Sequence, residues 1–479
     1  MKKFSIFLFS FNLIYYYSCF NLLNYSLIFP FHTIYLNEIE NISLYNESFS
    51  NNIIRNLYES NIYIKIKLGS PPQEIILPID ANSDDFFIGK PDADFDRNYP
   101  KRNGSFYFNK NLSSTFNYQI EKKGETFYSH PHLSNYVQDN IIIMSSDNRK
   151  ELNISDFKFL LAYQVRESYH GVIGLKGFSN IIRRTDFMTS LKNYNLTNNY
   201  IWYLQFNDSK TGNLIIGNYP HDDKYNKQNC NNCILQKKHF EKIYSNITKE
   251  SWKNQWGLNF KDIFIQNRTK FEKILTDCEK CKKVELNPNL RIIKGSKMYE
   301  EIIKNSIFNK YINLELCFKD TITINKNYEE NDYDYYYCNI SLNDDLKKEF
   351  NSLFFEHQIF KTNFSLDFND LFFQENEYIF FKIIFDQYYN WIFGAPFLSK
   401  YLFIFNSDTK EIGFYSKNIL YEDERENNNN NIDKYFIFKI IGITIFSILL
   451  ILIGIIIGKK LFGPKRKMRM NELEDNFEI

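Results

Sequence analysis

Apolar and polar residues alternate with a period of two in several short stretches of the chain. Ile62, Ile64, Ile66 and Leu68 alternate with one tyrosine and two lysines. This period places apolar side chains on one face of a β-strand. Short apolar runs of comparable length recur at Ile141–Met144, Leu214–Ile216, Ile263–Ile265, Ile322–Ile324 and Tyr401–Phe405. Helical periodicity is limited to short pieces such as Lys297–Asn305. We therefore predict a mostly β fold.

The N-terminal residues have the layout of an export signal. Lys2 and Lys3 precede an apolar run that begins at Phe4 and stays uncharged up to Glu38. A positively charged start followed by an apolar stretch is typical of a secretory signal. We predict a signal peptide or a signal anchor over residues 1–36. Both forms remain open, because the run is long and has no clean cleavage site of small residues.

The C-terminal residues predict a membrane anchor. Ile440–Gly458 contains nineteen consecutive uncharged residues. As a helix this run would extend about 29 Å, close to the roughly 30 Å of a hydrocarbon core. Aromatic residues precede it and six basic residues follow it, which predicts a cytosolic tail. We expect a stalk at 421–434, one transmembrane helix at 435–459 and a tail at 460–479. The chain would then be a type I single-pass membrane protein of the secretory pathway or cell surface.

Composition bounds the size of the body and the class of partner. The 479 residues are 44% apolar, which is enough for two substantial cores. Lys and Arg number 58 against 57 Asp and Glu, a formal charge of +1. This balance argues against nucleic acid as a partner. The oligomeric state is left open.

Export also predicts covalent modification. Cys19 lies in the predicted signal, and the other six cysteines form an even set that we expect to be disulfide-bonded, with fifteen possible connectivities. These are Cys230, Cys233, Cys278, Cys281, Cys317 and Cys338. Two C-x-x-C pairs could suit zinc, but they lie about 45 residues apart, wider than a zinc ribbon, so we predict no metal and no cofactor. Glycosylation sequons begin at Asn103, Asn195 and Asn363, although chance supplies many in an Asn-rich chain.

Two acidic loops carry the candidate chemistry. In each, an apolar stretch ends in an aspartate, at Asp80 within Ile75–Asp85 and at Asp277 within Lys273–Cys281. An enzyme of two lobes could bring one such carboxyl from each lobe together. Two carboxyls in contact share a proton, so that one acts as a base on water while the other polarises a substrate carbonyl.

Five ordered motifs resemble the pepsin-like aspartic peptidase family (peptidase family A1), over about residues 60–416. Tyr63–Glu74 is similar to the family's first hairpin, and the spacing from Gly69 to Asp80 matches the family's spacing to its first catalytic aspartate. The other motifs are Asn111–Phe116, Tyr128 before Asp139-Asn140-Ile141, Gly171–Leu175, and Trp391–Leu398 with its continuation to Phe414.

The resemblance implies a fold and a set of roles. It implies a two-lobed, mostly β body with an N-terminal lobe at 37–195, including a candidate pro-segment at 37–60, and a C-terminal lobe at 196–420. Asp80 and Asp277 would be the catalytic pair, without metal or cofactor. Tyr128 would be the flap residue over a bound peptide, and Ser83 would hydrogen-bond the first aspartate.

Both catalytic loops depart from the family's Asp-Thr/Ser-Gly. They read Asp80-Ala81-Asn82 and Asp277-Cys278-Glu279. In the family the threonine hydroxyls lock the two loops together, and neither alanine nor cysteine can replace them well. Pro78 also lies in a stretch that should be a central strand, where it removes a hydrogen bond.

Two functions therefore remain open. One is a membrane-anchored aspartic endopeptidase that hydrolyses peptide bonds with Asp80 and Asp277. The other is an inactive pseudo-peptidase whose ectodomain binds a peptide or a protein. Retention of both aspartates favours the first, and loss of the threonine and glycine positions favours the second.

Overall fold

The computed structural model divides the chain into two compact units, residues 1–417 and 418–479. It describes residues 26–34, 48–95, 105–125, 132–145, 150–165, 170–176, 186–222, 240–245, 256–267, 271–274, 282–326, 329–357, 363–387 and 390–415, all in the first unit. The predicted stalk, transmembrane helix and tail lie outside these residues. In the described part of the chain, no helix is long and apolar enough to cross a membrane.

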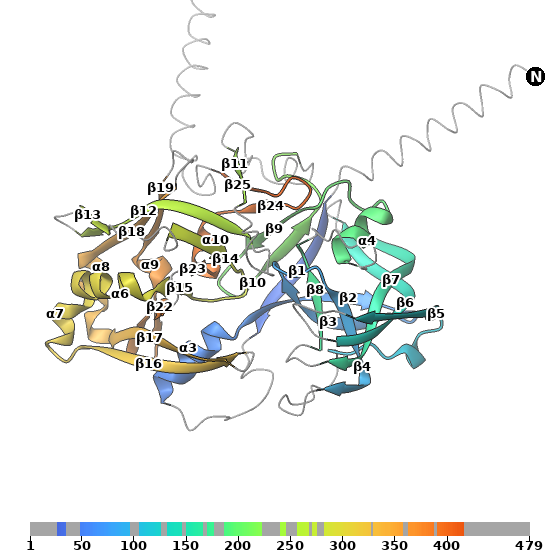
Figure 1. Ribbon diagram of the computed structural model, residues 1–479, viewed down its shortest axis with the longest axis horizontal. Coiled ribbons are helices and arrows are strands. Elements are labelled where there is room, and N and C mark those ends of the chain that lie inside the picture. The colour runs from blue at the N-terminus through green and yellow to red at the C-terminus, as the bar shows by residue number, and fades with distance from the viewer. Residues whose placement is uncertain are drawn as a thin grey trace, which may run out of the picture. The chain divides into compact units, whose positions relative to one another are not determined.

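The described strands form two large sheets, so the mostly β prediction is confirmed (Figure 1). The first sheet contains the N-terminal strands and is joined by the last two strands of the body. Its order is β11 (Phe240–Tyr244), β25 (Glu411–Tyr415), β24 (Ile404–Asn406), β9 (Ile201–Phe206), β10 (Thr211–Ile216), β1 (Leu27–Ile34), β2 (Asn61–Leu68), β3 (Gln73–Asp80), β8 (Gly171–Gly174), β4 (Phe86–Phe95), β7 (Glu151–Val165), β6 (His132–Ser145) and β5 (Asn117–Glu125).

The second sheet belongs to the later part of the chain. Its order is β19 (Asn363–Asp367), β18 (Phe350–His357), β12 (Gly257–Asn267), β14 (Lys283–Leu286), β23 (Trp391–Phe393), β15 (Ile293–Ser296), β22 (Ile383–Asp386), β17 (Glu329–Asn339), β21 (Tyr378–Phe381) and β20 (Phe372–Glu375), with β13 (Phe271–Ile274) on β12 and β16 (Cys317–Lys326) on β17. We call the body around β2–β8 the first lobe and the body around β12–β23 the second lobe. Each lobe lies on its own side of Figure 1.

Helices are short and lie between the strands. The α-helices are α3 (Phe49–Tyr58), α4 (Phe187–Asn193), α6 (Lys297–Ile303), α7 (Asn309–Ile312), α8 (Asn343–Glu349), α9 (Phe368–Leu371) and α10 (Ala395–Lys400). Tighter or wider turns form η1 (Lys110–Leu112), η4 (Lys304–Phe308) and η5 (Ile340–Leu342). The helix predicted from Lys297 is thus α6, and it continues into the η4 turn.

The period-two stretch of the sequence is strand β2. Ile62, Ile64, Ile66 and Leu68 are all buried, whereas Lys65 is exposed. These isoleucines pack with the alternate residues of β3, because β2 and β3 form an antiparallel hairpin that pairs Leu68 with Gln73. One buried face per strand is what makes the alternation readable in the sequence.

Strand β1 lies within the stretch that the sequence analysis assigned to an export signal. Residues 27–34 pair with β10 and with β2, and Leu27, Phe29 and Phe31 are buried in the core of the sheet. The sequence analysis assigned this stretch to a signal segment ending at residue 36. An amphipathic strand without charges looks the same as the end of an apolar signal run, so the two could not be separated by hydropathy. The predicted signal segment at 1–36 therefore overlaps a strand of the body at residues 27–34.

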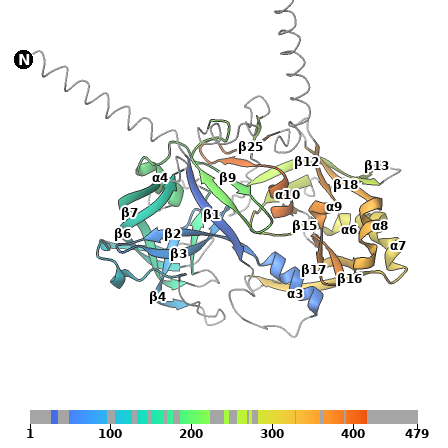
Figure 2. The same ribbon diagram turned by 180° about the vertical axis from the view of Figure 1, so that it is seen from behind.

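Helix α3 belongs to the core of the second lobe, although it comes directly before β2. Ser48 caps its N-terminus by accepting from the backbone of Asn51. Ile54 is fully buried. It forms a cluster with residues of the second lobe, namely Ile292, Ile322, Ile324, Tyr333, Tyr335, Phe380 and Ile384. Figures 1 and 2 both show α3 beside β16 and β17. The candidate pro-segment at 37–60 therefore contains a structural helix of the body.

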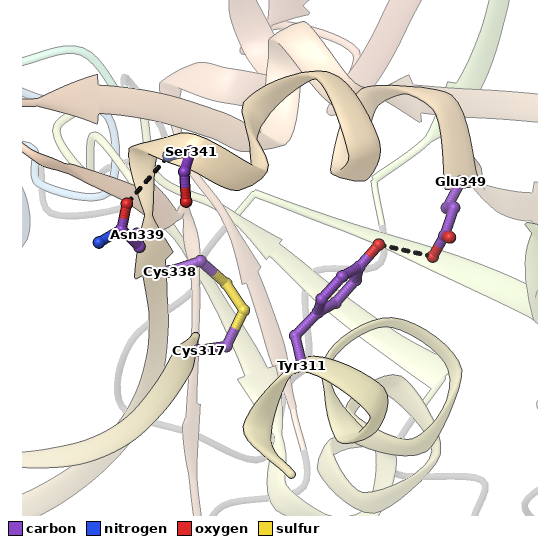
Figure 3. The surroundings of a disulfide bond; sticks show 6 residues. All are labelled: Tyr311, Cys317, Cys338, Asn339, Ser341 and Glu349. Atoms are coloured by element: carbon purple, nitrogen blue, oxygen red, sulfur yellow. Dashed lines mark hydrogen bonds between the residues drawn. A yellow bond between two sulfur atoms is a disulfide. The ribbon is translucent and has the colours of Figure 1, made fainter. Parts of the chain in front are cut away.

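One predicted disulfide is present in the described residues. Cys317 and Cys338 are directly opposite each other in the β16–β17 hairpin and are bonded, as Figure 3 shows. Both are buried. The bond closes the base of the hairpin on which α3 packs. Cys230, Cys233, Cys278 and Cys281 lie outside the described residues.

Candidate active site

The first candidate loop follows the end of β3. Ile79 and Asp80 pair in parallel with Ile173 and Gly174 of β8. The half-buried Asp80 carboxylate accepts a hydrogen bond from the backbone N–H of Asn82 at 2.7 Å. Asp80 thus lies where sequence analysis expected it, at the carboxyl end of a central strand.

Gly174 is essential to this arrangement for a steric reason. A Cβ atom on Gly174 would lie 2.4 Å from the carbonyl oxygen of Ser83 and 2.7 Å from the backbone nitrogen of Asp85. Contacts below 3.0 Å involving backbone atoms cannot be relieved by a side-chain rotation. The loop after Asp80 therefore folds directly against a position that only glycine fills.

The second lobe contains the same backbone arrangement around β14. We call this arrangement, a strand with its parallel partner strand and the turn that follows, a frame. Val284, Glu285 and Leu286 pair in parallel with Trp391, Ile392 and Phe393 of β23. The next residue, Asn287, donates its backbone N–H to the carbonyl oxygen of Phe393 at 3.0 Å. Its side-chain oxygen accepts from the backbone N–H of Asn289 at 3.1 Å, which is the same turn that Asp80 makes with Asn82.

The glycine on the partner strand identifies equivalent positions in the two lobes. A Cβ atom on Gly394 would lie 2.3 Å from the carbonyl oxygen of Leu290, just as one on Gly174 would meet that of Ser83. Ser83 is three residues after Asp80, and Leu290 is three residues after Asn287. The second-lobe counterpart of Asp80 is therefore Asn287.

This result changes the assignment of the second loop. Strand β3 is continuous from the hairpin to Asp80, but its counterpart is divided into β13, which pairs with one end of β12, and β14, which pairs with the other. The predicted catalytic Asp277 follows β13 and lies among residues 275–281, outside the described residues. In the described strands, the position equivalent to that of Asp80 is occupied by Asn287, which follows β14.

A signal in the sequence could have located Asn287. An apolar strand begins six residues after Asp80, at Phe86, and another begins six residues after Asn287, at Ile293. After Asp277 the chain continues with Cys, Glu, Lys, Cys and two lysines. Asp277 was chosen because it is acidic. The apolar strand that must follow the loop six residues later indicates Asn287 instead.

The match to a known family covers the first part of this frame. Residues 61–280 match the model of the eukaryotic aspartyl protease family. This part of the chain belongs to that family. No curated protein matches the chain. The matched stretch of the aspartyl protease domain begins at β2, includes Asp80, and ends before Asn287.

The asparagine of the first loop reaches into the second lobe. The side-chain oxygen of Asn82 accepts from the backbone N–H of Trp256, 3.2 Å away. Its side-chain nitrogen donates to the carboxylate of Glu285 at 3.5 Å. Trp256 comes directly before β12, and Glu285 lies in β14.

The asparagine of the second loop reaches back in the same way. The side-chain oxygen of Asn289 accepts from the backbone N–H of Ile62 at 3.1 Å, and its side-chain nitrogen donates to the carbonyl oxygen of Ile79 at 2.8 Å. Ile62 lies in β2, and Ile79 comes directly before Asp80. Asn82 and Asn289 thus occupy equivalent positions and make equivalent bonds.

The remaining residues of the first loop are accommodated without a break in β3. Ser83 is buried, and its hydroxyl accepts from the backbone N–H of Asp85 at 3.0 Å. Ala81 is buried in the core. Pro78 is the last residue of β3 that pairs with β2, and pairing with β8 begins at the next residue. The proline therefore lies where the strand changes partners, so the loss of its N–H is tolerated.

The predicted flap residue, Tyr128, lies outside the described residues. The strands on either side of it, β5 and β6, form an antiparallel hairpin in which Glu125 pairs with Leu133. The aspartyl protease domain therefore has a hairpin where the resemblance requires a flap.

The end of α3 contacts the second loop. The Ser60 hydroxyl donates to the carbonyl oxygen of Asn289 at 3.0 Å, and the backbone N–H of Arg291 donates to the carbonyl oxygen of Leu57 at 3.1 Å. The hydroxyls of Tyr58 and Tyr333 are 3.0 Å apart. Burial raises the pKa of Tyr58, and nearby carboxylates add to the rise. Sequence analysis did not anticipate these contacts, since they join segments more than two hundred residues apart.

Proposed function

We propose that this chain is an aspartyl protease homologue whose two-lobed ectodomain binds a peptide or a protein without hydrolysing it. Asn287 carries the proposal, because it has the backbone position in the second lobe that Asp80 has in the first. The cross-lobe bonds of Asn82 and Asn289 support the same pairing of the two loops.

The chemistry of an amide explains why hydrolysis is not expected. The two-carboxyl mechanism needs one group to take a proton from water and a second to hold and return one. An asparagine amide neither shares nor transfers a proton at ordinary pH, although it still donates and accepts hydrogen bonds. Loss of well-placed proton transfer costs roughly a hundredfold to ten-thousandfold in rate. Binding through hydrogen bonds does not require that transfer.

The alternative is an active endopeptidase that uses Asp80 and Asp277. Asp80 favours it, since its carboxylate is at the end of a central strand and accepts from the loop backbone as a catalytic carboxylate would. Tyr128 would then act as the flap residue.

We also propose that the ectodomain is exported and anchored by the single C-terminal span at 435–459. The uncharged run with its one-sided basic cluster supports this topology. The sequon residues Asn195 and Asn363 are exposed on the body, as glycosylated residues must be. Protease protection of intact vesicles tests the topology. A tag at Ile479 should be digested from the cytosolic side, and a shielded tag with a digested body would reverse the orientation.

The function is tested by cleavage and binding with the full chain in detergent. A peptide library at pH 3–7 should be cleaved by neither the wild type nor Asp80→Ala, while the wild type retains binding to some of its members. Cleavage by the wild type that is lost in both Asp80→Ala and Asp277→Ala would establish the endopeptidase instead.

A gain-of-function variant sharpens this test. Asn287→Asp restores a carboxyl opposite Asp80 and should produce acid-dependent cleavage that disappears when Asp80→Ala is added. Asp277→Asn is the matched control and should change nothing. If Asp277→Asn abolished cleavage by the wild type, the assignment of Asn287 to the catalytic position would be wrong.

A further inference from the structure

The two loops are joined by asparagines at matching positions, two residues after Asp80 and two residues after Asn287. Each amide side chain uses its oxygen and its nitrogen across the lobe boundary. The family carries glycine at these positions, so bonds of this kind are not available to its Asp-Thr-Gly loops.

The groups that these asparagines satisfy are buried. Ile62 and Trp256 are 0% and 1% exposed, and each donates its backbone N–H to an asparagine oxygen of the opposite lobe. A buried N–H that loses its partner costs free energy comparable to a lost hydrogen bond. The same side chain must also donate to the carbonyl oxygen of Ile79 or to the carboxylate of Glu285. This requires an acceptor and a donor together, and an amide has both in one plane.

Each asparagine is also tied to the residue two positions earlier. The backbone N–H of Asn82 donates to the Asp80 carboxylate, and that of Asn289 donates to the Asn287 side chain. A cross-lobe bond of Asn82 or Asn289 therefore restrains the orientation of Asp80 or Asn287 as well.

We propose that Asn82 and Asn289 are positioning residues that form a reciprocal lock between the lobes, in place of the threonine hydroxyls that Ala81 cannot supply. Each asparagine holds its own loop against the first hairpin and the central strand of the other lobe. The two halves depend on each other, because displacement of either loop moves the strand to which the other is bonded. The lock holds whether or not the proposed function is right, since it involves no proton transfer.

The lock predicts a specific pattern of amide exchange. In Asn82→Gly, the segment containing Trp256 should exchange about tenfold faster, and the segment containing Ile62 should follow because the lobes separate. Asn289→Gly should give the same pair of changes, starting from Ile62. Hydrogen exchange with mass spectrometry on the full chain in detergent measures both segments in one experiment.

Two controls separate positioning from general loss of stability. Ile143→Val shortens a buried residue of β6 that pairs with Leu152 of β7, so any effect on exchange should be spread over the first lobe. Glu285→Gln keeps an acceptor for the Asn82 amide and should preserve protection, whereas Glu285→Ala should partly remove it at the Trp256 segment.

The outcomes decide the proposal. Selective deprotection of both segments by either asparagine variant, with protection preserved in Glu285→Gln, supports the lock. Deprotection confined to the directly bonded segment would show two independent contacts and overturn the reciprocal lock. Unchanged exchange at Trp256 in Asn82→Gly, or the same profile in Ile143→Val, would also overturn it.

Discussion

The loop after β3 and the loop after β14 share a backbone frame but differ in chemistry. Both follow a strand that pairs in parallel with a partner strand, and both fold against a glycine, Gly174 or Gly394. The first presents the carboxylate of Asp80 and the second presents the amide of Asn287. Packing around the frame is thus preserved in both lobes, whereas of these two described strand ends only the first carries an acid.

This difference separates residues that are required by the fold from residues that determine the chemistry of the loop. The two glycines are required sterically, because any Cβ would meet backbone atoms. Their presence therefore indicates that the fold is preserved. The residue at the strand end makes the same turn bond whether it is Asp or Asn. Its chemical identity is therefore free to change without loss of the fold.

The largest expected effect tests whether glycine is required equally at the two positions, 174 and 394. Gly174→Ala and Gly394→Ala should each destabilise the body by about 3 kcal/mol or more, because the new methyl group overlaps backbone atoms that cannot rotate away. Gly295→Ala is the control in the second lobe and should cost about 1 kcal/mol, since its nearest neighbours are side chains at 3.1–3.2 Å. Chemical denaturation measures all three. A mild effect at Gly394 alone would mean that the second frame is looser.

A somewhat smaller effect tests whether the segment before β2 belongs to the second lobe. Ile54→Ala should cost about 3 kcal/mol, because it leaves a cavity among Ile292, Tyr333 and their neighbours. Phe49→Ala, on the same helix but 45% exposed, should have little effect. Thermal unfolding measures the difference. Equal and small effects would show that α3 is dispensable, as a removable pro-segment would be.

A third expectation concerns an ionic cluster of the second lobe. Lys319 lies 2.7 Å from Glu300 and 2.9 Å from Asp334, and both carboxylates are buried. Lys319→Ala should cost about 1–2 kcal/mol at neutral pH, less than a fully buried pair because the Lys319 side chain is 39% exposed. Chemical denaturation at pH 7 checks this, and an unchanged midpoint would contradict it.

The pH dependence of this cluster has a defined sign. Burial would raise the pKa of Asp334, but hydrogen bonds from Lys297, Thr321 and Lys319 outweigh it and lower that pKa to about 2. The resulting stability is present above an unfolded pKa of 3.8 and is lost as the pH falls from about 4 through about 2. Lys319→Ala should raise the folded pKa of Asp334, so that the loss becomes smaller and is complete at a higher pH in melting curves recorded from pH 2 to 5. An unaltered acid profile would mean that Lys319 does not hold Asp334.

The smallest expected effect comes from a surface pair of the first lobe. Lys67 and Glu151 lie 2.8 Å apart, but their side chains are 40% and 56% exposed. Solvent and salt screen such a pair. Lys67→Ala should therefore leave the melting temperature unchanged at physiological ionic strength. A clear decrease in melting temperature would mean that this pair contributes to stability as the buried cluster of the second lobe does.

The sequence alone determined the class of fold and the position of Asp80 at the end of a strand. Alternation in β2, the hairpin before Asp80 and the glycine motifs at 171–175 and 391–398 depend on local packing, so each is readable within about ten residues. Asp80 followed from its fixed spacing to Gly69. The cysteine set correctly included Cys317 and Cys338, although their pairing required the β16–β17 register.

Only the tertiary structure decided the second half. Strand β13 and strand β14 share one partner, β12, and hydropathy cannot tell which of two short strands continues into the loop. The extent of β1, the membership of α3 in the second lobe and the cross-lobe bonds of Asn82 and Asn289 likewise join residues far apart in the chain. The physical reason is that a local pattern records which side of a strand is buried, whereas the partner of that strand is chosen by long-range packing.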